Sequence, residues 1–207
     1  MTAVTLPGQS SRVGAGHPEP RRLVALGESS RLLALDPGTH RSAWIALDLV
    51  TRRPKGFGIA RNEALLGRLR RGGRAFDLVV IEKVESFGMA VGAEVFETVF
   101  WSGRFAEAVD PTPVERIGRK AVKLTLCGTD RAKDPNVRQA LIDRYGGKER
   151  AVGTKASPGP LHGIVKDVWA ALAVGVAWLE GASRMDSAAI RTAPLGRPVA
   201  PTGDVAG

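Results

Sequence analysis

Two short apolar segments of this chain each end in a carboxylate, and this pattern is the strongest chemical signal in the sequence. The segment 31–36 (RLLALD) ends at Asp36, and the segment 77–82 (DLVVIE) ends at Glu82. A third acid, Asp167, lies in the first turn of an otherwise apolar segment nearer the C-terminus. If the two strands run parallel, their acids meet at one edge of the sheet. We therefore expect these side chains to lie together.

Three neighbouring carboxylates repel one another, and a divalent cation between them offsets that repulsion. Because all the ligand atoms would be oxygens, we expect Mg²⁺ or Mn²⁺. Such a cluster can hold two ions about 4 Å apart, which stabilise the attacking and leaving oxygens of phosphodiester hydrolysis. Each acid also has a structural interpretation: Asp36 in a turn before a Pro-Gly pair, Glu82 as a solvated strand end, and Asp167 at a helix N-terminus.

Hydrophobic periodicity predicts the elements that carry these acids. Segments 31–36 and 42–50 are predicted strands joined by a turn at 37–40, which makes an antiparallel hairpin. Further strands are expected at 57–59, 77–82 and 113–117, and helices at 63–71, 89–109, 134–145 and about 164–179. This order predicts an α/β fold with a mixed sheet flanked by helices.

Proline and glycine are concentrated near the two ends of the chain. We expect a flexible N-terminal tail at 1–30, one folded domain at 31–181 and a flexible C-terminal tail at 182–207. The central region has about 150 residues, which is a common size for a single domain.

The composition favours an anionic partner and excludes several protein classes. The 207 residues include 30 Lys and Arg against 21 Asp and Glu, a net charge of +9, which favours nucleic acid. No run of about 18 apolar residues predicts a membrane span, and no secretory signal is evident. The lone Cys127 can form no internal disulfide and supports no cysteine-based zinc site. We expect a protein of the cytoplasm, in a bacterium or a phage-infected cell.

The positive charge lies in two blocks of the predicted domain. Residues 52–74 contain eight Lys and Arg and one acid, and residues 115–155 contain eleven Lys and Arg and five acids. Clustered cations of this kind bind phosphates and release counterions. The alternative is a solvated basic face, which describes most charge runs.

Three segments together carry a family resemblance: Leu33–Gly38 (LALDPG), Val79–Val84 (VVIEKV) and Lys166–Val174 (KDVWAALAV). In order and spacing the chain resembles the RuvC-type Holliday junction resolvases of the RNase H-like superfamily, over about residues 31–181. It is most similar to the divergent RuvC-like proteins of phages and bacterial genomes. The resemblance implies an RNase H-like sheet with Asp36, Glu82 and Asp167 as metal ligands, Asp36 reaching both ions. It also implies a two-fold homodimer that cuts opposing strands.

The last motif departs from the family pattern. RuvC resolvases usually have two aspartates three residues apart there, whereas this chain has Asp167 and Ala170. His162 is a candidate for the missing catalytic group, with a plain surface histidine in the loop 157–163 as the alternative. Asp48 and Glu85 are weaker substitutes, and Asp48 is expected to face away from the cluster.

The resemblance also directs attention to DNA contacts. Arg119, Lys120 and Lys123 are predicted to bind backbone phosphates, with Lys123 the first choice near the metal ions. Phe87, in the segment 86–92 after the Glu82 strand, is a candidate wedge between base steps, and ordinary core packing is the alternative.

These features predict a metal-dependent, structure-selective endonuclease that cleaves Holliday or other branched DNA junctions in recombination, repair or phage DNA processing. The expected cofactor is Mg²⁺ or Mn²⁺ as two ions, and the expected partners are branched DNA and a second copy of the chain. Two alternatives stay open: a catalytically weakened RuvC-like DNA-binding protein, which Ala170 favours, and an RNase H-like nuclease for another nucleic acid such as an RNA–DNA hybrid.

Overall fold

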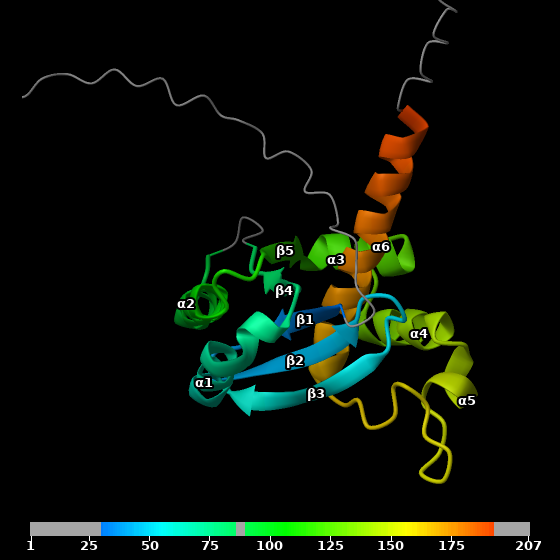
Figure 1. Cartoon of the computed structure of the whole chain (residues 1–207), viewed down its shortest axis with the longest axis horizontal. Coiled ribbons are helices and arrows are strands. Elements are labelled where there is room, and N and C mark those ends of the chain that lie inside the picture. Colours follow the sequence, from blue (N-terminus) through cyan, green and yellow to red (C-terminus); the bar gives the residue numbers. More distant parts are fainter. Residues whose placement is uncertain (1–29, 86–89, 193–207) are drawn as a thin grey trace, which may run out of the picture.

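The chain forms a five-stranded mixed sheet. The computed structural model describes residues 30–85 and 90–192, with side chains only up to Gly181 in the last helix. The strand order is β3-β2-β1-β4-β5 (Figure 1). The first three strands are antiparallel, and β4 and β5 run parallel to β1. The strands are β1 (Arg31–Asp36), β2 (Arg41–Asp48), β3 (Pro54–Arg61), β4 (Leu78–Lys83) and β5 (Val114–Gly118). The predicted α/β class, with an antiparallel first hairpin, is confirmed.

Helices cover both faces of the sheet, and α1 and α6 lie on opposite sides of it (Figure 1). The alternation of side chains along β1 explains both layers: Leu33 and Leu35 pack with residues of α1 and α2, whereas Leu32 and Ala34 pack with residues of α3, α4 and α6. The helices are α1 (Asn62–Gly72), α2 (Ala93–Ala108), α3 (Arg119–Cys127), α4 (Asp134–Arg144), α5 (Gly147–Ala151) and α6 (Val168–Thr192), with a short 3₁₀ turn at Gly73–Ala75.

Gly175 allows α6 to approach the sheet closely. A Cβ atom at this position would lie 2.8 Å from Cδ1 of Leu47 and 3.1 Å from Cβ of Ala34. Only glycine therefore fits between α6 and the strands β1 and β2. Among the helices of the described chain, none is long and apolar enough to cross a membrane.

Two elements differ from the prediction in length. Strand β3 covers eight residues instead of three, because Gly56 and Gly58 interrupt the apolar alternation while lying beside the ring of Trp44. Helix α6 begins at Val168 and continues to Thr192, so residues 182–192 are helical where the sequence predicts a tail. This stretch contains no proline or glycine and several good helix formers.

Two helices are absent from the prediction. Helix α3 is only nine residues long, and its C-terminus is closed by Gly128 in the left-handed conformation with φ of 72°. Its buried residues Val122 and Leu126 have the i, i+4 spacing of a helix face, a signal too short to stand out from the sequence. Helix α5 has five residues; it begins at Gly147 directly after Gly146, and both glycines have positive φ.

Candidate active site

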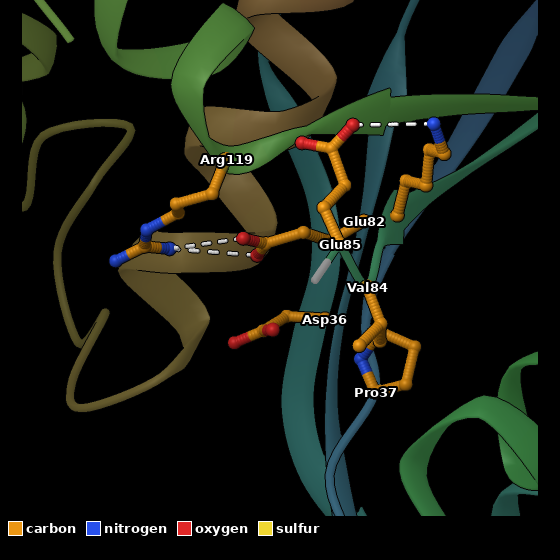
Figure 2. A pocket seen from close by; sticks show the side chains of 7 residues that line it. Asp36, Pro37, Glu82, Val84, Glu85 and Arg119 are labelled. Atoms are coloured by element: carbon orange, nitrogen blue, oxygen red, sulfur yellow. Dashed lines mark hydrogen bonds and ion pairs between the residues drawn. The ribbon is translucent and has the colours of Figure 1, made fainter. Parts of the chain in front are cut away.

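Parallel pairing of β1 with β4 brings Asp36 and Glu82 together. The register pairs Leu35 with Ile81, so the two acids follow at adjacent strand ends. Alternate residues before each acid, such as Ala34 and Val80, are buried against α6. Because side chains alternate along a strand, both acids project to that face of the sheet. Figure 2 shows the two carboxylates extending to the same side of the strands.

The surroundings of Asp36 raise the pKa of its carboxyl group strongly. Burial, then the charge of Glu82 and a hydrogen bond with it, raise the pKa of Asp36 from 3.8 to about 8. The charge of Asp167 contributes a smaller increase in the same direction, and the charge of Arg119 lowers the pKa. A carboxyl pair that cannot ionise fully by itself is a site that favours a bound cation.

Arg119 supplies a positive charge next to this pair. Its Nη1 lies 3.4 Å from Oε2 of Glu82, and its Nη2 donates a 2.6 Å hydrogen bond to Oδ1 of Asp134 (Figure 2 shows the contact with Glu82). Strand β5 positions it: Ile117 pairs with Glu82, and α3 begins two residues later. The sequence predicts a DNA contact for Arg119, whereas the structure engages its guanidinium with two carboxylates of the chain.

A cavity of about 220 Å³ opens beside the acids. Its lining includes a further carboxylate, Glu85, which forms an ion pair with Lys83 at 3.2 Å. Any side chain at Gly118 would collide with the carboxylate of Glu85, so the glycine leaves room for it. The lining residues are Asp36, Pro37, Glu82, Lys83, Val84, Glu85 and Arg119 (Figure 2).

The remaining predicted site residues lie farther from the pair. Asp167 is exposed just before α6 and acts on Asp36 through its charge. His162 is exposed in the loop before α6, where its Nδ1 lies 3.1 Å from the carbonyl oxygen of Val152. Within the described part of the chain, no three His, Cys, Asp or Glu side chains are close enough together to hold a metal ion.

The remaining acid candidate lies away from the acid pair, and two candidate lysines lie on the helix next to it. Asp48 pairs with Arg31, at the opposite end of β1 from Asp36. Lys120 and Lys123 lie in α3, the first exposed and the second half-buried, on the helix that begins beside the cavity. Phe87 lies outside the described residues.

Comparison with solved structures identifies the fold. The structure of Thermus thermophilus RuvC matches with a TM-score of 0.54 and 18% sequence identity, over 75% of this chain and 96% of that chain. This chain has a RuvC-like fold. Thermus thermophilus RuvC in complex with a Holliday junction substrate matches with a TM-score of 0.55 and 18% identity, over 76% and 97% of the two chains. No protein-family model matches the sequence, and no curated protein is similar to it.

Proposed function

We propose that this chain is a metal-dependent endonuclease that cleaves Holliday or other branched DNA junctions. The observation that carries the proposal is the pair Asp36 and Glu82, which lie side by side near the ends of adjacent parallel strands on a RuvC-like fold. The solved RuvC complex with a Holliday junction substrate supports the choice of branched DNA. The basic charge around the acids suits a phosphate backbone.

The chemistry of the donor set fits a hard divalent cation. Asp36 and Glu82 would hold it, and two further carboxylates are available: Asp167, whose charge acts on Asp36, and Glu85, which lines the cavity. When bound there, Mg²⁺ or Mn²⁺, as one or two ions, would polarise the scissile phosphate and lower the pKa of a bound water. The two carboxylates would orient this centre, and Arg119 balances the charge of Glu82. Lys120 and Lys123, at the start of α3, are proposed to bind the backbone phosphates next to it.

Helix α2 carries an apolar stripe that suits a homodimer. Phe96, Val99 and Phe100 are 65%, 43% and 56% exposed, and their spacing places them on one side of the helix. The opposite side, with Trp101 and Phe105, is buried against the sheet. We propose that this stripe packs against a second copy of the chain. A Phe96→Ser/Phe100→Ser variant should then sediment as a monomer, and an unchanged dimer would rule out this interface.

A catalytically weakened DNA-binding protein is the second candidate. One observation favours it: His162, a candidate for the group missing at Ala170, places its Nδ1 3.1 Å from the carbonyl oxygen of Val152 and forms no described contact with the acid pair. In that case the chain would bind junctions tightly but leave them intact.

A single cleavage assay separates the candidates. Labelled four-way junction, linear duplex and RNA–DNA hybrid are incubated with the protein in Mg²⁺ or Mn²⁺. Symmetric nicks in the junction, lost in Asp36→Asn and kept in Asp143→Asn on the exposed face of α4, support the nuclease. Tight binding without cleavage in either metal supports the second candidate. Cleavage of the hybrid alone contradicts branched DNA as the substrate.

A further inference from the structure

A second cavity, of about 320 Å³, lies where β2 begins and β3 ends. It is lined by His40, Arg41, Arg61 and Glu63, and all four residues are exposed. With neutral histidine the lining carries two positive charges and one negative charge. The excess is positive, so the cavity suits an anion.

The two arginines face each other across neighbouring strands. Arg41 and Arg61 are directly opposite in the antiparallel pairing of β2 with β3. Like charges in this position destabilise a sheet. In the part of the chain whose side chains are described, neither guanidinium forms an ion pair with a carboxylate. An anion between them would remove the repulsion.

A buried polar network holds this arrangement in place. Asn62, the residue after Arg61, is fully buried, and its Nδ2 donates to the carbonyl oxygens of Gly38 and Thr39 at 2.9 and 3.2 Å. Its Oδ1 accepts a 2.7 Å hydrogen bond from the hydroxyl of Ser42, and its backbone N–H donates to the carbonyl of His40. These hydrogen bonds fix the turn before Arg41 to the end of β3, which carries Arg61. Such preorganisation lowers the entropy cost of binding.

The cavity faces the same way as the acid pair. Ala43 lies two residues after Arg41 on β2, and Phe57 lies four residues before Arg61 on β3, so each points to the same face of the sheet as its arginine. Both pack on the face covered by α6. This is also the face of Asp36, which pairs with Ala43. Neighbouring strands are about 4.8 Å apart and a strand rises about 3.3 Å per residue, so the backbone positions of Arg41 and Arg61 lie roughly 8–12 Å from that of Asp36. At about 3.4 Å of helix rise per nucleotide, this is a span of roughly two to four nucleotides.

We propose that Arg41 and Arg61, assisted by His40, clamp a backbone phosphate of the DNA a few nucleotides from the one at the acid pair. This inference rests on the proposed function, because it assumes that nucleic acid crosses the face with Asp36. The ligand is a phosphodiester group, recognised by charge and by the fixed fork of the two guanidinium groups. The site positions the strand and reads no base sequence.

Binding without cleavage tests the clamp. Fluorescence anisotropy with a labelled four-way junction in EDTA compares the wild type, Arg41→Gln/Arg61→Gln and the control Arg31→Gln/Arg53→Gln. The control removes the same charge from exposed positions at the opposite end of the sheet, where β1 begins at Arg31 and Arg53 precedes β3. The clamp variant should bind at least tenfold more weakly, given the usual strength of hydrogen bonds to charged groups. Its plot of log affinity against log salt should be shallower by about 0.9, the value for one lost phosphate contact.

The outcomes separate this site from the proposed nuclease activity. If the wild type cleaves junctions while the clamp variant binds exactly as the control does, the clamp is wrong and the nuclease stands. If the wild type binds but never cleaves, and the clamp variant loses affinity and salt dependence, the clamp stands and the nuclease is wrong. A parallel thermal-shift measurement uses inorganic phosphate. Stabilisation by phosphate that the clamp variant loses, with DNA binding unchanged, would assign the cavity to free phosphate and overturn the proposal.

Discussion

Replacing Asp36 by asparagine should stabilise the metal-free protein. At neutral pH the folded chain must keep a proton on Asp36, whose pKa is about 8, or tolerate two adjacent carboxylates. The unfolded chain has neither constraint, because there the carboxyl ionises near 3.8. The amide of asparagine carries no charge and can donate a hydrogen bond to Glu82. Activity and stability at this position therefore oppose each other.

The size of the effect follows from the raised pKa. Below pH 3.8 the carboxyl is protonated in both states, and between 3.8 and 8 only the folded state keeps the proton, so folding loses stability as the pH rises. Each pH unit corresponds to about 1.36 kcal/mol, which gives at most about 4 kcal/mol at neutral pH. Because the site is partly open to water, we expect about 2–4 kcal/mol, or a Tm increase of roughly 5–15 °C for a chain of this size.

Thermal unfolding in EDTA between about pH 4 and pH 8 measures the effect. The advantage of Asp36→Asn should be small near pH 4 and grow towards pH 8. Added Mn²⁺ should stabilise the wild type more than the variant. A variant less stable than the wild type at neutral pH in EDTA, or an advantage independent of pH, would refute the reasoning.

Asp48 provides a control of opposite sign. Its carboxylate accepts a 2.8 Å hydrogen bond from the backbone N–H of Thr51, and this bond, with Lys55 beside it, lowers the pKa of Asp48. A lowered pKa stabilises the fold above about pH 4, and that stability is lost as the pH falls through the folded value. Asp48→Ala should therefore lower the Tm at neutral pH, with a difference that shrinks in acid.

Other substitutions test the site, the turn network and the helix packing. Arg119→Gln should bind Mn²⁺ several-fold more tightly in calorimetry, because Glu82 loses its guanidinium partner; weaker binding would contradict this charge balance. Asn62→Ala should lower the free energy of unfolding in urea by about 1–3 kcal/mol, since its buried partners lose their hydrogen bonds, and an unchanged midpoint would count against the network. Gly175→Ala should cost about 1–3 kcal/mol through overpacking, whereas Gly181→Ala, into open space, should not destabilise in the same titration.

The sequence predicts most of the sheet because its strands are short, apolar and sharply ended. Successive residues of the segment 31–36 pack against the helices on opposite faces of the sheet, so residues 32–35 are all apolar. The charged residues Arg31 and Asp36 mark the two ends of the strand. Strand β3 is less evident because glycines beside Trp44 replace the apolar residues that would reveal it. The C-terminal end of α6 differs for another reason: residues 182–192 include several helix formers, but the prolines and glycines that follow from Pro194 onward favour a tail in the sequence.

The acid pair is predictable because Asp36 ends β1 and Glu82 lies one residue before the end of β4. Parallel pairing of the two strands is enough to bring these positions together. The role of Arg119 is not, since its ion pairs require β5 beside β4 and the start of α4 nearby. The position of His162 depends on the path of the loop between α5 and α6, which no periodicity specifies. Asn62 offered a weak signal, a polar residue at the start of a helix, without indicating its buried partners.

The parallel pairing of β1 with β4 also determines when this site can form during folding. The β1–β2–β3 meander needs only short connections, so its strands can pair through local contacts. Glu82 reaches Asp36 only after α1 has crossed over and β4 has added to the edge of the meander, a contact between distant parts of the chain. Non-local contacts of this kind form slowly because loop closure comes first. A nascent chain ending at Arg61 would hold Asp36 and the antiparallel strands but no acid pair, so the paired carboxylates mark chains that have completed the sheet.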